Sequence, residues 1–264
     1  MFTLLPNIKN TLRLMRYFIQ LSYKGTAFHG WQIQPNALSV QEVLNNALTT
    51  ILNTKIDTTG AGRTDSGVHA KQMFAHFDYE NLENPSSYIS KLNSYLPKDI
   101  AVQNLYVVHP EAHARFDATQ RTYQYFINNQ KNPFLQDSSW FYAQSLDVNA
   151  MNSAAALLLE HTNFQCFSKV NTEVATFDCR VYEAFWKTNS NQLQFTISAD
   201  RFLRNMVRAI VGTLIKVGLH KITLSEFNAI IESKDRSEAG FSVPAHGLHL
   251  TQINYPYLTP IITE

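Results

Sequence analysis

A glycine-rich segment of the chain places a carboxylate and a guanidinium close together. Three of the nine glycines of the protein fall within residues 60–67, Gly-Ala-Gly-Arg-Thr-Asp-Ser-Gly, and Arg63 and Asp65 lie between the second and the third. Glycine adopts backbone conformations that other residues avoid and lets a ligand approach closely. A rigid turn that presents two such side chains is typical of a functional site. In the alternative interpretation, Asp65 only caps the segment that follows.

The segment does not match the common catalytic or nucleotide-binding motifs. No Gly-Lys-Ser/Thr follows the glycines as in a P-loop, and no helix of adequate length begins there as in a dinucleotide-binding turn. The chain lacks the Gly-x-Ser-x-Gly of serine hydrolases, and no second carboxylate stands out as a glycosidase would require. The role of Asp65 therefore has to be inferred together with other parts of the chain.

A second candidate segment, residues 201–212, combines arginines with apolar residues. If this segment is helical, at about 100° per residue, Arg201, Arg204 and Arg208 share one face. The helix is otherwise apolar, and an unpaired buried charge is costly, so we expect Arg208 to have an acidic partner. Gly212, one turn later, would leave room beside it. We interpret Arg201 and Arg204 as solvated or as structural partners of acidic side chains.

The sequence gives no indication of a metal site, a disulfide or a membrane segment. Cys166 and Cys179 are the only cysteines, which fits a reducing cytoplasm. His246 and His249 are the closest candidate ligand pair, but they lie in a predicted strand without a third ligand. Residues 1–6 are too short and too poor in charge for a signal peptide, and the apolar runs end well short of a membrane span. We therefore expect a soluble cytoplasmic protein with no metal and no membrane association.

The elements that would position these side chains can be read from the hydrophobic pattern. Strands are predicted at residues 14–23, 72–79, 101–108, 121–128, 181–187, 192–198 and 248–255, with a hairpin turn at 188–191. Helices are predicted at 39–52, 87–96, 147–160 and 202–217, and another begins at 223. Ser39 with Glu42, and Thr223 with Glu226, have the spacing of capping boxes.

This mixture of strands and amphipathic helices predicts an α+β fold with a largely antiparallel sheet covered by helices. The character of the sequence changes between residues 109 and 121, which divides the chain into residues 1–112 and 113–264. No linker rich in Pro, Gly or Ser separates the two parts, so we expect two packed halves of similar construction. Hydrophobic residues make up 45% and charged residues 16% of the chain, as in a folded protein.

The segment around Asp65 resembles the active-site loop of the tRNA pseudouridine synthase A family. Further blocks resemble the family in the same order along nearly the whole chain: residues 23–32, Tyr-Lys-Gly-Thr-Ala-Phe-His-Gly-Trp-Gln; 75–77, Ala-His-Phe; 114–116, Ala-Arg-Phe; 121–125, Arg-Thr-Tyr-Gln-Tyr; 202–208, Phe-Leu-Arg-Asn-Met-Val-Arg; and 244–248, Pro-Ala-His-Gly-Leu. Lys24, Gln72 and Met73 depart from the usual family residues, which concerns substrate preference more than activity.

The resemblance implies an isomerase that converts uridine to pseudouridine in tRNA, at positions 38 to 40 of the anticodon stem-loop. It implies that Asp65 is the catalytic carboxylate, acting as a nucleophile or as a base, on a uridine flipped out of its stack. Tyr123 would hold the base, Arg208 would pair with Asp65, and Arg63 would order the loop or contact phosphate. The family is homodimeric and uses neither a metal nor a redox cofactor.

Two other functions remain compatible with the residues. The chain could be an RNA-binding module without activity, or a small-molecule glycosyl transferase that uses the same Asp65. A net charge of only +1 does not by itself indicate a nucleic-acid partner, so a phosphate-binding surface would have to be local. The presence of Asp65, Tyr123 and Arg208 together favours the enzyme.

Overall fold

The computed structural model describes residues 14–170, 174–189 and 191–258. Residues 1–6 and Ser190, part of the predicted hairpin turn, therefore lie outside the described residues. The described strands form a single sheet in the order β4-β1-β3-β9-β5-β8-β7, with β2 paired to β3 and β6 paired to β5. Their bounds are β1 Met15–Tyr23, β2 Thr59–Gly60, β3 His69–Tyr79, β4 Ile100–Val108, β5 Gln120–Asn128, β6 Trp140–Phe141, β7 Val181–Asn189, β8 Gln192–Ala199 and β9 Leu248–Asn254. The sheet is largely antiparallel, as predicted.

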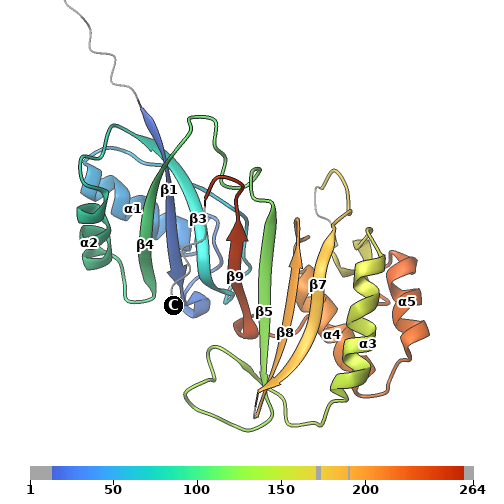
Figure 1. The fold of residues 1–264 in the computed structure, drawn as a ribbon. Helices are drawn as coiled ribbons and strands as arrows, with labels where there is room; N and C mark the ends of the chain where they lie inside the picture. The colour runs from blue at the N-terminus through green and yellow to red at the C-terminus, as the bar shows by residue number, and fades with distance from the viewer. Residues whose placement is uncertain (1–13, 171–173, 190, 259–264) are drawn as a thin grey trace, which may run out of the picture.

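Five α-helices accompany the sheet in the described residues, and together with it they confirm the α+β class. They are α1 Val40–Leu52, α2 Pro85–Tyr95, α3 Val148–Leu157, α4 Met206–Gly218 and α5 Leu224–Ser233. Figure 1 shows α1 and α2 beside the β4 edge and α3, α4 and α5 beside the β7 edge. None of the helices in the described residues is long and apolar enough to cross a membrane.

The helix starts follow from side chains that accept the first free N–H groups. Ser39 caps α1 by accepting the Glu42 N–H, and Asp147 caps α3 by accepting the Ala150 N–H. Thr223 and Glu226 form the full predicted capping box of α5. The predicted helix at 87–96 begins two residues earlier, because Asn84 caps it and Pro85 occupies its first position.

Two buried apolar clusters lie against the sheet. The first joins β1, β3 and β4 to α1 and α2 around residues such as Phe18 and Leu44, and the second joins β5, β7 and β8 to α3, α4 and α5 around Phe195 and Ile210. Ala114 and Leu250 pack in the first cluster although they lie beyond residue 112. The division of the chain at residue 112 stays a prediction.

The two clusters meet at β9, which contributes Leu248 to the second and Leu250 to the first and pairs with β3 along a seam. These strands are parallel, and their paired positions are His69 with His249 and Ala70 with Leu250. The pairing begins directly after the loop that carries Asp65, so this loop lies where the two clusters adjoin. The expected strand location of His246 was wrong, because this residue lies in a short 3₁₀ turn at Ala245–Gly247 that precedes β9.

Candidate functional site

Two of the three glycines around the loop that carries Asp65, between β2 and β3, are required by the structure. A Cβ atom added to Gly60 would overlap the Trp31 ring, and Gly67 has a φ of +79°, which disfavours other residues. Gly62, in contrast, has open space around it. The Val68 N–H donates to the Asp65 carbonyl at 3.1 Å and closes the turn. Gly60 and Gly67 are therefore required by the packing and the turn, and Gly62 is not.

The Asp65 carboxylate faces the other half of the chain. Its Oδ2 atom accepts a hydrogen bond of 3.2 Å from the Arg208 guanidinium in the first turn of α4. Arg208 Nε donates at 2.7 Å to the Val243 carbonyl, so the guanidinium has two acceptors. Both side chains are largely buried, with 26% of Asp65 and 20% of Arg208 exposed. The Asp65 carboxylate accepts no hydrogen bond from a backbone N–H of the described residues that follow it. Asp65 therefore does not cap a turn, as the alternative interpretation would require.

A second arginine near Asp65 was missed by the sequence analysis. The predicted helix at 202–217 begins only at Met206, because Asn205 adopts a left-handed conformation with φ of +68°. Arg201 and Arg204 therefore precede the helix and do not share a helical face with Arg208. Arg204 Nε lies 3.9 Å from Asp65 Oδ1, and 58% of its side chain is exposed. Only recognition of the left-handed turn at Asn205 would have placed Arg204 beside Asp65 from the sequence.

The space expected beside Arg208 is filled. A Cβ atom added to Gly212 would overlap the Phe241 carbonyl oxygen, because residues 240 and 241 pass directly against α4. The chain then continues to Val243, whose N–H donates to the Arg208 carbonyl at 3.2 Å. Gly212 thus allows a backbone segment to approach α4, and this segment supplies the second acceptor of Arg208.

Tyr123 is half-buried on β5, and the Phe202 ring lies perpendicular to its ring, with ring centroids 5.2 Å apart. Burial raises the pKa of Tyr123 to about 12, an effect that Arg121 opposes and Asp65 reinforces. At neutral pH the Tyr123 hydroxyl is protonated, so in the free protein it is a hydrogen-bond donor rather than a base.

Arg121, two residues from Tyr123, connects segments around the loop. Its guanidinium donates to the carbonyls of Ala118 and Asp200, at 3.2 and 2.8 Å, and to those of Ala61 and Arg115, at 2.9 and 2.7 Å. Ala61 belongs to the Asp65 loop, whereas Asp200 follows β8 in the other half. A planar guanidinium has enough donors in a fixed arrangement to hold several carbonyls at once. Arg121 therefore ties the loop to the strand that carries Tyr123.

Arg63 and residues 244–247 complete the surroundings of Asp65. Arg63 is exposed and makes no hydrogen bond or ion pair with any residue that the structure describes. In the sequence, residues 244–248 stood out only through the family resemblance. In the structure the Pro244 carbonyl accepts the Tyr125 hydroxyl at 2.8 Å, and Ala245 lies against Gly67.

Comparison with known proteins places this arrangement in a family. The sequence model of the family described as tRNA pseudouridine synthase matches residues 20–117 and 154–256. The chain belongs to the tRNA pseudouridine synthase family. It is similar to the tRNA pseudouridine synthase A proteins of Parabacteroides distasonis, at 49% identity over 92% of this chain and 97% of that protein, and of Bacteroides thetaiotaomicron, at 49% over 92% and 91%. The Bacillus subtilis protein of the same name is 37% identical over 91% of this chain and 99% of its own length.

The three departures from the usual residues of the tRNA pseudouridine synthase family have local partners. Lys24 Nζ forms an ion pair of 2.9 Å with Asp137 in the segment between β5 and β6. The Gln72 side chain accepts the Ile253 N–H at 2.8 Å and so links β3 to β9. Met73 is fully buried in the first apolar cluster. Each departure is thus accommodated by the fold.

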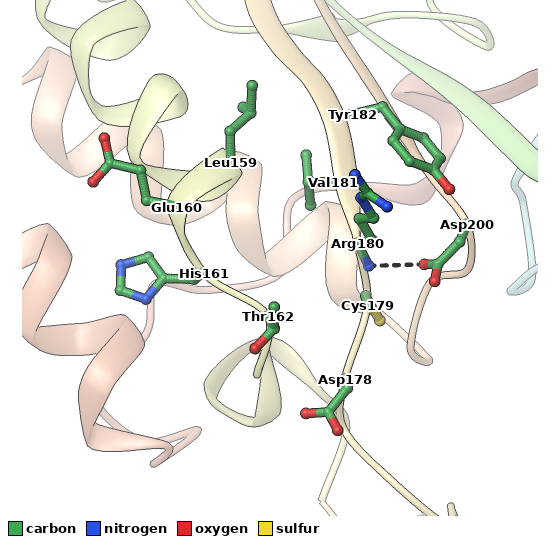
Figure 2. Close-up of a pocket in the computed structure, with 10 residues that line it drawn as sticks. All are labelled: Leu159, Glu160, His161, Thr162, Asp178, Cys179, Arg180, Val181, Tyr182 and Asp200. Carbon is green, nitrogen blue, oxygen red and sulfur yellow. Dashed lines mark hydrogen bonds between the residues drawn. The ribbon is translucent and has the colours of Figure 1, made fainter.

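A cavity of about 500 Å³ lies apart from Asp65, in the C-terminal half (Figure 2), and is lined by residues 159–162, 178–182 and 200. Two of its three acidic side chains are engaged locally. Asp200 accepts the Arg180 and Arg201 N–H groups at 2.8 and 2.6 Å, and Asp178 accepts the Thr176 hydroxyl at 2.6 Å. The described residues contain no group of three or more His, Cys, Asp or Glu placed to share a metal ion. The candidate site is therefore the region around Asp65.

Proposed function

We propose that this chain isomerises uridine to pseudouridine in tRNA, with Asp65 as the catalytic carboxylate. The observation that carries the proposal is the pairing of Asp65 with Arg208 across the two halves, within a family of tRNA pseudouridine synthases. Asp65 is partly exposed, so a substrate can reach it, and it is held by a charged partner that leaves one carboxylate oxygen, Oδ1, beside the exposed Arg204.

The reaction needs a carboxylate and no external electron donor. The bond between N1 of uracil and C1′ of ribose breaks, the base turns, and C5 bonds to C1′. The proton of C5 is lost and N1 gains one, so no atom is oxidised or reduced overall. A carboxylate can serve this chemistry as a nucleophile or as a base at C2′. Both roles are compatible with Asp65 in the proposed site.

The remaining residues have roles that follow from their positions. The target uridine has to leave its stack to reach Asp65, and the Tyr123 ring offers a surface for stacking. Arg208 orients the Asp65 carboxylate. Arg63, exposed and without a partner among the described residues, is suited to contact phosphate or to order the loop when RNA binds.

The finer parts of the proposal concern the substrate and the assembly. The uridines are those at positions 38 to 40 of the anticodon stem-loop, and the enzyme acts as a homodimer in the cytoplasm without a cofactor. These features are carried over from the family resemblance. Mapping of pseudouridine in tRNA from cells with and without the protein tests the positions directly.

The catalytic role of Asp65 is tested by the substitution Asp65→Asn. Asparagine has nearly the same size and also suits a turn, but it has no charge and is a poor nucleophile or base. We expect the variant to fold, to bind tRNA with near-normal affinity, because phosphate and stacking contacts dominate binding, and to form essentially no pseudouridine. The measurement is tritium release from tRNA labelled at uracil C5, beside a binding assay.

A matched control is Asp78→Asn, because Asp78 also pairs with an arginine, Arg16, at 2.7 Å, but lies on the far part of β3. This variant should release tritium at the wild-type rate. Wild-type release by the Asp65 variant would remove Asp65 from the mechanism. Binding of tRNA by the wild type without any release would favour the RNA-binding module, and release from free nucleosides would favour the small-molecule enzyme.

A further inference from the structure

A buried hydroxyl lies directly behind the Asp65 loop. Tyr23 is the last residue of β1, is only 4% exposed, and its hydroxyl lies 2.9 Å from Oγ1 of Thr64, the residue that precedes Asp65. The tyrosine hydroxyl has no other hydrogen-bond partner among the described residues. A buried hydroxyl without a hydrogen-bond partner costs free energy of folding. The contact with Thr64 is therefore a specific requirement of this site.

The main chain of Thr64 is held as well. Its carbonyl accepts the Trp31 N–H at 3.3 Å, and a Cβ atom added to Gly30, which has a φ of +88°, would overlap the same carbonyl oxygen. Thr64 is thus fixed through both its side chain and its backbone by two segments of the N-terminal half. Asp65 follows immediately, and its own carbonyl closes the turn with Val68. The direction of the Asp65 side chain therefore depends on how Thr64 is held.

We propose that Tyr23 is a positioning residue that, through its hydrogen bond to Thr64, sets the direction in which Asp65 presents its carboxylate. The inference rests on the proposed function of Asp65. It assigns the carboxylate two supports: Tyr23 and Thr64 act on the backbone from the N-terminal half, and Arg208 acts on the carboxylate from the C-terminal half. Because Tyr23 contacts neither the carboxylate nor the exposed side of the loop, it acts through Thr64.

Electrostatics agree with a hydroxyl that stays protonated. Burial raises the pKa of Tyr23 well above its usual value, the hydrogen bond to Thr64 opposes this shift, and Tyr123 adds to it. A protonated Tyr23 retains its hydrogen bond to Thr64 over the whole pH range in which the enzyme would work.

The test uses Tyr23→Phe, Thr64→Val, the double variant and Thr64→Ser, each assayed for single-turnover pseudouridine formation and for tRNA binding. Small misplacements of a reacting group are expensive, so each single variant should react about tenfold more slowly. Because both variants remove the same hydrogen bond, the double variant should lose no more than either single one. The dissociation constant for tRNA should stay within about twofold of the wild type, since the contact lies on the buried side of the loop. Thr64→Ser keeps the hydroxyl and should form pseudouridine at the wild-type rate.

A matched control is Tyr106→Phe. The Tyr106 hydroxyl donates to the Gln20 side chain at 2.9 Å, in the same sheet as Tyr23 but away from the Asp65 loop. This variant should react at the wild-type rate. A wild-type rate in Tyr23→Phe, losses that multiply in the double variant, a loss confined to tRNA binding, or an equal loss in Tyr106→Phe would each overturn the inference. Activity in Asp65→Asn, measured beside them, would instead defeat the proposed function, so the two failures are distinguishable.

Discussion

At the scale of single residues, Arg208 divides its guanidinium between the Asp65 carboxylate and the Val243 carbonyl. A lysine has a single ammonium group and cannot reproduce two separated, fixed donors. We therefore expect Arg208→Lys to retain the fold but to lose pseudouridine formation by tenfold or more, because a hydrogen bond to a charged group contributes about 1.5–3 kcal/mol. Single-turnover kinetics with tRNA, beside a thermal unfolding curve, measure both effects.

The chain offers a close control for this substitution. Arg16 also divides its guanidinium between a carboxylate and a carbonyl, of Asp78 at 2.7 Å and Ala112 at 3.0 Å, without contacting Asp65. Arg16→Lys should therefore change the unfolding temperature about as much as Arg208→Lys while leaving the rate intact. If Arg208→Lys turns over normally, the arginine is a structural residue and its contact with Asp65 is incidental.

At this scale the sequence singles out the loop residues, and the family resemblance implied the pairing of Arg208 with Asp65 that the structure shows, but two other contacts of the site were not predicted. Asp65 and Arg63 stand out because their glycine neighbours are close in sequence. Arg204 did not, because its position depends on one left-handed residue, Asn205. Tyr23 did not, because its partner Thr64 is 41 residues away and nothing local indicates that a strand tyrosine supports a loop.

At the scale of elements, periodic helices were predicted well and the start of α4 was not. The stripe of apolar residues in α1 is periodic from end to end, and Ser39 marks its beginning. In the α4 region Leu203 is buried although it precedes the helix, so hydrophobic character continues across the true boundary. Hydrophobicity reports burial and does not distinguish a buried turn from a buried helix.

The seam between β3 and β9 contains two stacked imidazole rings that should make folding sensitive to acid. The rings of His69 and His249 have centroids 4.6 Å apart. Burial lowers the pKa of His249 to about 4 and lowers that of His69 as well. Below the unfolded value of about 6.5 the unfolded chain binds protons that the folded seam does not. The free energy of unfolding should therefore fall as the pH decreases from about 6.5 toward 4.

Urea unfolding of the wild type and of His249→Gln at pH 7 and pH 5 measures how much His249 contributes to this pH dependence of stability. Glutamine can still donate a hydrogen bond to the Ser138 carbonyl, which His249 Nε2 contacts at 2.8 Å, but it does not titrate. The variant should lose less stability between the two pH values than the wild type does. An equal loss in both proteins would show that His249 does not contribute. The source would then lie among the other histidines whose pKa burial lowers, which are His69, His76, His113 and His246.

At the scale of the whole molecule, the site exists only because two halves adjoin. Asp65 comes from the half built on β1, β3 and β4, whereas Arg208 and Tyr123 come from the half built on β5, β7 and β8. Figure 1 shows β3 and β9 side by side at the centre of the sheet. A parallel pairing between strands nearly two hundred residues apart, such as His69 with His249, leaves no local trace in the sequence. Composition and periodicity could predict the layers but not the point at which they meet.

The net charge of the molecule is only +1, so RNA binding has to depend on a local concentration of positive charge. Arg63, Arg204 and Arg208 all belong to the surroundings of Asp65, and Arg63 is exposed and has no partner in the part of the chain that the structure describes. Phosphate contacts release counterions, so the affinity for tRNA should fall steeply as salt increases.

Arg63→Gln should reduce the slope of log affinity against log salt by about 0.7–0.9, the value of one phosphate contact. Lys234→Gln, at the end of α5 on the outer side of the molecule (Figure 1), should leave the slope unchanged. An affinity for tRNA that stays constant between low and moderate salt would contradict electrostatic binding, and equal slopes in all three proteins would remove Arg63 from the phosphate-binding surface.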